Sequence, residues 1–317
     1  VENQQIINQP NNQFTPGIFV QDEFTATDKF TILAGARVDH YRDHGLIFAP
    51  RWSMKYKPST WTTVRTNFGT GFRIVNLFTE DHAFVTGQRT VEIREELQPE
   101  SSYNASLNIN QVYAALGGTG SIDVDGYFTH FNNKIIPDYE TVGKIIYENS
   151  AGYAQTMGIG ININHNFVSP LSITLGGNLQ RSYEVEPNES GVEERRNIEF
   201  APQWSAIFTT NYTWQRARMT FAYTIRATGR MELPEVYDLD ANGEPFPFPR
   251  STESEPFALH NFQVSKTFTE QFSLYAGIQN VTNFRQNSSP LIGYNDPAAA
   301  AGFSDYFDTS YAYAPNH

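Results

Sequence analysis

The sequence predicts an all-β fold, an antiparallel transmembrane β-barrel, and three observations support this prediction. Apolar and polar residues alternate along most of the 317 residues, which is the two-residue periodicity of a β-strand. Short and long connections alternate between these segments, as they do in outer-membrane barrels. No run of about 18 apolar residues occurs, so no membrane-spanning helix is expected. A barrel strand needs only about 9–11 half-polar residues, which gives a weak hydropathy signal.

The first predicted strands show the alternation most clearly. Ile18–Phe24 comes first, and Phe30–Arg42 follows with a regular pattern that only Leu33 interrupts. In Phe48–Lys57, every second residue from Phe48 is apolar, and most of the residues between them are Arg, Ser or Lys. In Val64–Arg73, Val, Thr and Phe alternate with Arg, Asn and Gly.

The pattern continues along the rest of the chain. In Met157–Phe167, for example, isoleucines alternate with Gly and Asn. In all we expect about twelve strands. The remaining ones are Tyr103–Tyr113, Ile122–Thr129, Leu171–Gln180, Trp204–Trp214, Arg218–Arg226, Phe262–Phe268 and Phe272–Ile278.

The connections also alternate in length. Short turns, mostly rich in the Gly, Pro, Ser and Thr that turns prefer, are expected at Thr27–Lys29, Lys57–Thr60, Leu116–Thr119, Val168–Pro170, Trp214–Ala217 and Thr269–Gln271. Longer polar links are expected at Ile74–Gln98, Pro137–Lys144, Glu184–Glu199, Arg230–Pro256 and Asn287–His317, with only Asp43–Leu46 short among them. In an outer-membrane barrel, short turns face the periplasm and long loops face the outside.

The direction of the two strand faces decides between a membrane barrel and a water-soluble β-sandwich, which would bury its apolar face in a core. The polar face is rich in Arg, Asn, Gly and Ser on successive strands, as the wall of a wet lumen would be. Aromatic residues cluster near strand ends, as in Trp52 and Tyr56, and suggest interfacial girdles. In lipid, only a closed barrel satisfies every backbone hydrogen bond of such strands.

The composition narrows the class of protein. A net charge of −12 argues against a nucleic-acid partner, because phosphate binding needs clustered Lys and Arg. The chain has no cysteine, so disulfides contribute nothing. No signal peptide is visible, and the polar first residues look like an internal loop. We therefore expect that an exported protein containing this chain begins further upstream.

Several segments resemble the barrel of TonB-dependent outer-membrane receptors, most of all those of Bacteroidetes-type bacteria. Phe48–Glu80 carries a Pro-Arg strand, an Arg-x-x-x-Gly-x-Gly-Phe-Arg strand and the start of a long loop, and Leu97–Ile109 begins with Leu-x-Pro-Glu. Tyr147–Phe167 is similar to the Asn-x-x-x-Ala/Tyr strand but has Gly160 where a Glu is common. Gly17–Tyr41 and the Asn-Val-Thr-Asn strand Ser273–Gln286 complete a resemblance that covers nearly the whole chain.

The resemblance implies a barrel of about 22 strands with a plugged lumen. Residues 1–317 would form a partial barrel domain that supplies roughly strands ten to twenty-one. The plug domain, about nine N-terminal strands and the final strand would be absent. Such a chain is a fragment, an incompletely described chain or one part of a split barrel, and the first two are favoured.

Arginines on the predicted lumen face are the first candidate ligand contacts. They are Arg37, Arg51, Arg65, Arg73, Arg218 and Arg226. One interpretation is a basic wall for an anionic ligand such as a ferric siderophore. The other is ion pairing with plug carboxylates or with Asp39, Asp123 and Asp125, which is favoured because buried charges are normally paired.

The outer loops supply further candidates. Glu80 and His82 lie beside a long loop, but no second metal ligand appears at a diagnostic spacing, so no metal site is predicted. Phe246, Phe248 and Arg250 belong to an alternating Pro-Phe segment that is either a rigid ligand-gripping tip or a packed loop. The acidic segments 184–199 and 232–255 lack the spacing of an EF-hand and are expected to be solvated.

No catalytic motif is evident. The chain has no Gly-x-Ser-x-Gly elbow, no His-Glu-x-x-His and no P-loop, and neither catalysis nor a cofactor is predicted. The resemblance implies an outer-membrane transporter or receptor that takes up a scarce ligand (siderophore, metal complex, vitamin, peptide or glycan) with energy from a TonB-type protein acting through the plug. The alternatives are a structural barrel subunit with a surface lipoprotein or envelope-complex partner, and a soluble carbohydrate-binding sandwich.

Overall fold

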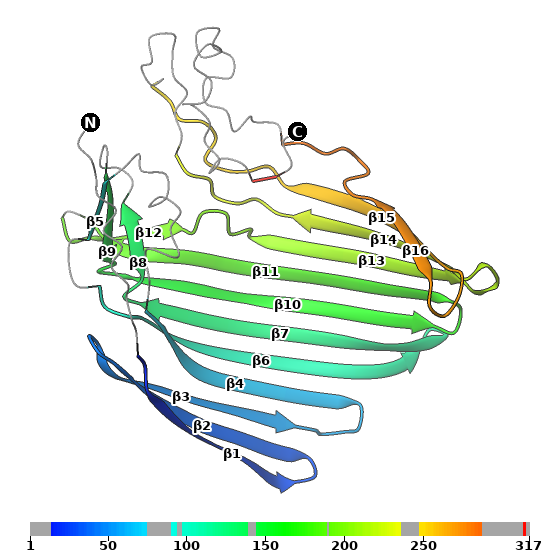
Figure 1. The fold of residues 1–317 in the computed structure, drawn as a ribbon, viewed down its shortest axis with the longest axis horizontal. Coiled ribbons are helices and arrows are strands. Elements are labelled where there is room, and N and C mark those ends of the chain that lie inside the picture. The colour runs from blue at the N-terminus through cyan, green and yellow to red at the C-terminus, as the bar shows by residue number, and fades with distance from the viewer. Residues whose placement is uncertain are drawn as a thin grey trace.

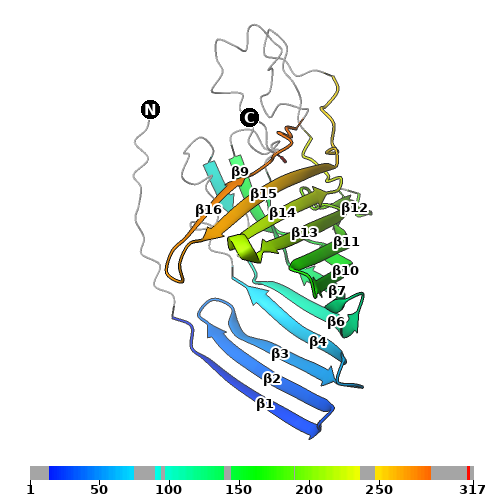
Figure 2. The same cartoon turned by 90° about the vertical axis from the view of Figure 1, so that its right-hand side faces the viewer.

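The computed structural model describes residues 14–74, 90–93, 97–138, 144–188, 190–235, 247–286 and 313–314. Its main body is one long antiparallel sheet (Figure 1), and the view from the side shows that this sheet curves into an open trough (Figure 2). Twelve strands follow one another in chain order across the sheet, which confirms the predicted fold class. No helix in the described residues is long and apolar enough to cross a membrane.

The strands of the trough are longer than most strands of soluble proteins. They are β1 (Gly17–Thr27), β2 (Phe30–Tyr41), β3 (Gly45–Tyr56), β4 (Thr62–Arg73), β6 (Glu100–Ala115), β7 (Gly118–Asn132), β10 (Tyr153–Phe167), β11 (Leu171–Pro187), β13 (Trp204–Trp214), β14 (Met219–Thr228), β15 (Phe257–Thr267) and β16 (Ser273–Ile278). The six predicted short turns lie at one end of the trough (Figure 1), and the short link between β2 and β3 lies at the other, among the long links, as predicted. The turn before β14 holds the 3₁₀-helix η1 (Gln215–Ala217).

Three links predicted as loops contain residues of further strands. β11 continues to Pro187 and pairs with β12 (Glu193–Asn197), so the link 184–199 is largely a β-hairpin and not a loop. The residues of β12 are all exposed, as the prediction of a solvated segment requires. Three short strands form a separate small sheet: β5 (Thr90–Ile93), β8 (Ile135–Asp138) and β9 (Lys144–Asn149). The dense charges of β12 hide its alternation, because a polar strand has no apolar face to signal it.

The strand register places side chains of one kind on one face. Phe68 of β4 is opposite Ala105, Ala105 is opposite Phe128, and Phe128 is opposite Met157, so an apolar row crosses four strands. The other face carries polar rows, and it lines the concave side of the trough. Since residues alternate between faces with a period of two, the apolar rows lie on the convex side, as predicted.

Little of the described chain is buried in a conventional core. The buried apolar residues are all at the long-loop end: Ile135, Tyr147, Ala154, Val185, Met231 and Leu233. On the convex face, large side chains such as Leu179 and Ile159 keep 61% and 53% of their surface exposed. A soluble sandwich would bury these residues, whereas a membrane barrel presents them to lipid.

Candidate functional site

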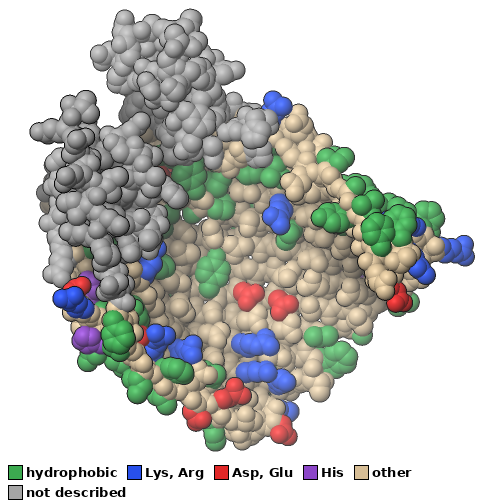
Figure 3. Space-filling view, in the orientation of Figure 1, with side chains coloured by type: hydrophobic (Ala, Val, Ile, Leu, Met, Phe, Trp, Pro, Cys, Tyr) green, Lys and Arg blue, Asp and Glu red, His purple; other side chains and the backbone are tan. Residues whose placement is uncertain are grey.

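The concave polar face is the first candidate site, because it gathers the arginines singled out from the sequence. Figure 3 shows basic and acidic side chains close together over the middle of this face. The register places Lys55 opposite Arg65, Arg65 opposite Asn108 and Asn108 opposite Asp125, so this row runs from β3 to β7. The strand pleat therefore brings charges far apart in sequence onto one wall.

Arg37 is held by an ion pair on its own strand. Its Nε and a terminal nitrogen donate to the two oxygens of Asp39 at 2.6 and 2.8 Å. Asp39 is fully buried, whereas the Arg37 side chain is 60% exposed. Residues two apart on a strand share a face, which explains this local pair. This pair is one instance of the ion pairing expected between the lumen-face arginines and Asp39, Asp123 or Asp125.

Arg51 and Arg73 also have partners inside the chain. Arg51 donates a hydrogen bond to the side chain of Gln21. Arg73 forms an ion pair with Glu100 at 2.8 Å, and the other oxygen of Glu100 accepts from the backbone of Ile135 at 3.0 Å. Glu100 thus joins the trough to the small sheet, and Arg73 helps to hold that joint.

Within the described part of the chain, Arg65 contacts an amide and not a carboxylate. It donates to Asn108 at 3.1 Å, and Asn108 donates to Asp125 at 2.8 Å. Asp123 accepts from Asn110 at 2.8 Å. The expected ion pairs of Asp123 and Asp125 with arginine are therefore wrong among the described residues, because asparagines stand between the charges and satisfy one oxygen of each carboxylate.

Arg226 stands apart from the other arginines of the concave face. It lies opposite Ile207 and Leu259, is exposed, and forms no hydrogen bond or ion pair within the described part of the chain. Arg218 is not part of β14: it follows η1 with a left-handed backbone, at φ 49°. Arg218 was predicted as a lumen-facing strand residue, but the turn extends through Arg218, one residue further than predicted, and β14 begins only at Met219.

The loop candidates are only partly visible. Glu80, His82 and Phe246 lie outside the described residues. Phe248 is 80% exposed, and Arg250 is half-buried and engaged in an interaction. Within the described residues, no hydrogen bond or ion pair joins either of them to the concave arginines, so their role as ligand contacts stays a prediction.

Acidic groups gather where the long links leave the trough. Partial desolvation of the Glu199 carboxyl, together with the charges of Glu184 and Glu232, raises the pKa of Glu199. Lys134 neutralises part of this region through an ion pair with Glu184 at 3.0 Å. Among the described residues, no three His, Asp or Glu side chains are arranged to hold a metal ion.

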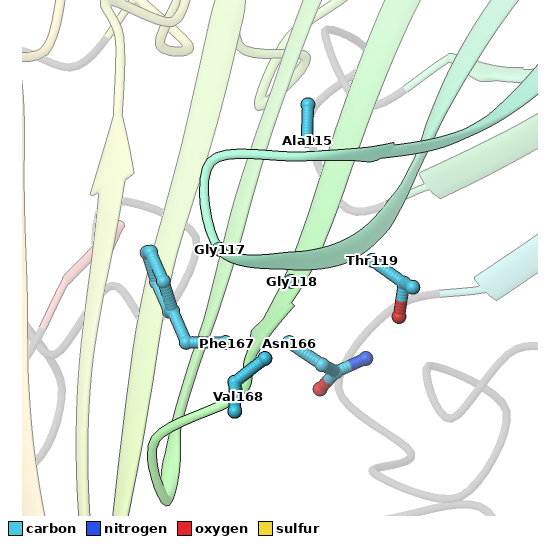
Figure 4. A pocket seen from close by; sticks show the side chains of 7 residues that line it. All are labelled: Ala115, Gly117, Gly118, Thr119, Asn166, Phe167 and Val168. Atoms are coloured by element: carbon cyan, nitrogen blue, oxygen red, sulfur yellow. The ribbon is translucent and has the colours of Figure 1, made fainter.

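A hollow in the surface lies away from these groups. It measures about 560 Å³ and lies at the short-turn end, where the turns between β6 and β7 and between β10 and β11 meet (Figure 4). Its lining is Ala115, Gly117, Gly118, Thr119, Asn166, Phe167 and Val168. Its polar side chains are Thr119 and Asn166 (Figure 4), and no charged side chain lines it, so it is a poor candidate for binding a charged ligand.

Amide side chains organise much of the concave face, and they were not among the candidate residues predicted from the sequence. Asn108, Asn110 and Gln21 each contact a charged side chain on another strand. Asn108 and Asn110 were visible only as polar positions of an alternating strand. Their partners depend on the register between strands, which a single sequence does not specify.

Comparison with known proteins gives a consistent result. The family described as "TonB dependent receptor-like, beta-barrel" matches residues 3–281. Two curated relatives are iron-regulated outer membrane virulence proteins of Vibrio cholerae serotype O1. The El Tor Inaba protein is 27% identical over 231 residues, which are 68% of this chain and 34% of the relative. The Classical Ogawa protein is 29% identical over 119 residues, 37% of this chain and 18% of the relative.

Solved structures share the fold at low sequence identity. The FrpB iron transporter from Neisseria meningitidis has a TM-score of 0.64 at 13% identity, with 86% of this chain and 41% of that chain covered. The siderophore receptor PirA from Acinetobacter baumannii has a TM-score of 0.63 at 14% identity, with 87% and 43% covered. This chain thus spans at most about a third of the two Vibrio relatives and less than half of these two structures.

Proposed function

The chain belongs to the TonB-dependent receptor-like β-barrel family of the outer membrane, and from this premise we propose that it is part of an active transporter for an iron chelate. The observation that carries the proposal is a trough with an apolar convex face and a charged, hydrogen-bonded concave face. A barrel wall of this kind faces lipid on one side and a polar path on the other. The iron-related names of the relatives and structural neighbours support iron as the cargo.

Energy would come from a TonB-type protein through a plug domain in the lumen. β1 and β16 each pair on one side only within the described residues. In lipid, unpaired strand edges are too costly to persist, so strands of the same protein would cover both edges and close the barrel. Residues 14–286 would then form part of a larger barrel wall, with the plug against its concave face.

Arg226 is the concave arginine best placed to meet an anionic chelate or the plug. Arg37 and Arg73 are already engaged with carboxylates. An exposed guanidinium without a partner can donate to an incoming carboxylate or catecholate oxygen without first breaking an ion pair. Arg226 is therefore the most informative residue to mutate in a test of ligand contact.

The test is uptake of radiolabelled ferric chelates by cells that carry the full-length protein or lack its gene. We expect the deletion to abolish energised uptake of one chelate, and loss of the TonB-type protein to do the same. Arg226→Gln should weaken that uptake by about tenfold, the loss of one charged hydrogen bond. The matched control is Arg216→Gln, which removes the same charge from η1 at the short-turn end.

The competing function is a barrel subunit of a surface complex with a lipoprotein partner. Unchanged uptake of every iron chelate in the deletion strain, together with a partner that copurifies in equal amount, would replace the transport proposal with that function. Unchanged uptake in Arg226→Gln alone would remove only the role of this arginine.

A further inference from the structure

The outward residues of β11 change from apolar to polar and aromatic near its long-loop end. From Leu171 to Leu179, every outward residue is apolar or glycine, and the next two outward residues are Arg181 and Tyr183. This apolar run matches the ~9–11 residues with which a barrel strand crosses the hydrocarbon layer. Arg181 and Tyr183 therefore lie where the strand leaves that layer on the long-loop side.

Aromatic side chains continue this boundary across the neighbouring strands. His130 stacks between Tyr103 and Tyr153, with ring centres 4.8 and 5.0 Å apart. Gln155 donates to Nδ1 of His130 at 2.9 Å and accepts from the hydroxyl of Tyr183. Aromatic rings with polar edges are typical of membrane interfaces, and this network holds the Tyr183 ring in place.

Two guanidinium groups meet at that ring. Arg195 of β12 lies over Tyr183, with its guanidinium carbon 3.5 Å from the ring centre, and Arg181 lies at 5.9 Å. Both side chains are exposed, and neither forms a hydrogen bond or an ion pair within the described part of the chain. Glu193 lies on the same face of β12 and is exposed, but it forms no ion pair with either arginine.

The opposite face of the same hairpin provides a contrast. Arg196 is opposite Glu184, so it points to the other side of the hairpin from Arg195. It pairs with Glu194 at 3.5 Å. Of the two adjacent arginines of the hairpin, Arg196 thus has an ion-pair partner. The outward one, Arg195, is stacked on an aromatic ring and can still bind an external anion.

We propose that Arg181, Arg195 and Tyr183 form a binding site for the phosphate of a lipid headgroup in the outer leaflet. Guanidinium groups are well suited to phosphate because they donate two parallel hydrogen bonds. Basic residues beside a membrane span bind anionic lipid headgroups, and a ring beneath a guanidinium fixes its orientation. The inference rests on the outer-membrane placement of the chain and not on the identity of its cargo.

The test measures lipid binding to the purified full-length protein in detergent. The probes are a bis-phosphorylated glucosamine-disaccharide lipid, the same lipid without phosphate, and inorganic phosphate. The readouts are bound lipid by native mass spectrometry and the midpoint of thermal unfolding. We expect only the phosphorylated lipid to bind and to raise the midpoint. The double variant Arg181→Gln/Arg195→Gln should weaken binding by at least about tenfold, and Arg196→Gln should bind as the wild type does.

Equal binding of the two lipids to the wild-type protein would overturn the proposal, and so would equal binding by the double variant and the wild type. Inorganic phosphate that raises the midpoint as much as the lipid does would also overturn it, because the site would then bind a free anion. If the double variant does not insert, the comparison of the three probes on the wild-type protein decides. Uptake of iron chelates stays intact in the double variant, so this test and the transport test fail independently.

Discussion

Asp39 has no exposed surface, yet it carries a charge on a strand that crosses the membrane. Its two hydrogen bonds from Arg37 compensate for the loss of water around the carboxylate. By contrast, Asp123 accepts a neutral bond from Asn110 and is only half-buried. The two aspartates are therefore expected to contribute differently to the free energy of unfolding, because only Asp39 is fully buried.

Asp39→Asn is expected to destabilise the barrel by about 1.5–3 kcal/mol, because Arg37 loses its charged partner. The measurement is the urea concentration at which the folded, heat-modifiable form of the full-length protein is lost. Asp123→Asn is the control, since an amide oxygen still accepts the bond from Asn110. Equal stability of Asp39→Asn and the wild type would show that the buried pair contributes nothing.

The environment of Glu199 predicts that local stability depends on pH. Its pKa is raised in the folded state by desolvation and by Glu184 and Glu232, so the protonated form fits the fold better than the charged form. The stability that it contributes is therefore present at acidic pH and lost as the pH rises through the raised pKa. Glu199→Gln should stabilise this rim at neutral pH and remove that part of the pH dependence.

Hydrogen exchange of the backbone around residues 198–203, measured at pH 5 and at pH 7.5, can check this. In the wild type, protection should fall toward the higher pH, and in Glu199→Gln it should change less. Glu255→Gln, outside this set of interacting carboxylates, serves as the control. A variant with the same pH dependence as the wild type would refute the role of Glu199.

At the scale of elements, β6, β7 and β10 interlock through a tyrosine packed over a glycine. Tyr113 of β6 lies over Gly120 of β7, and its hydroxyl meets Nδ1 of His165 on β10 at 3.2 Å. A Cβ atom at Gly120 would come within 2.5 Å of the Tyr113 ring and 2.4 Å of a backbone oxygen of Asn164. The missing side chain thus makes room for the ring.

Gly120→Ala is expected to cost about 1–3 kcal/mol of stability, because the tyrosine and the strand backbone must shift. Gly126→Ala is the matched control: it lies on the same face of β7, and a Cβ there meets nothing within 4 Å. Thermal unfolding of the two variants gives the comparison. Similar midpoints for both would show that the contact between Tyr113 and Gly120 is not tight in the folded protein.

At the scale of the whole molecule, the open edges of the trough are the decisive feature. β1 and β16 carry unpaired backbone groups on their outer sides within the described residues, and such groups cost several kcal/mol each in hydrocarbon. Residues 14–286 refolded alone in detergent are therefore expected to give no compact, protease-resistant monomer. The full-length protein should give one, and a resistant monomer from the isolated segment would contradict the proposed larger barrel.

The sequence by itself determined the twelve strands of the trough, their two faces and the end at which most turns are short. These follow from a local periodicity of two residues, and family membership agrees with them. Only the tertiary structure decided which partner each charged side chain contacts: Arg37 pairs with Asp39, Arg65 with Asn108, and Arg195 lies over Tyr183. It also showed the hairpin of β11 and β12, whose charged residues carry no apolar signal. Partners across strands depend on register, and register is set by packing and turn geometry along the whole sheet.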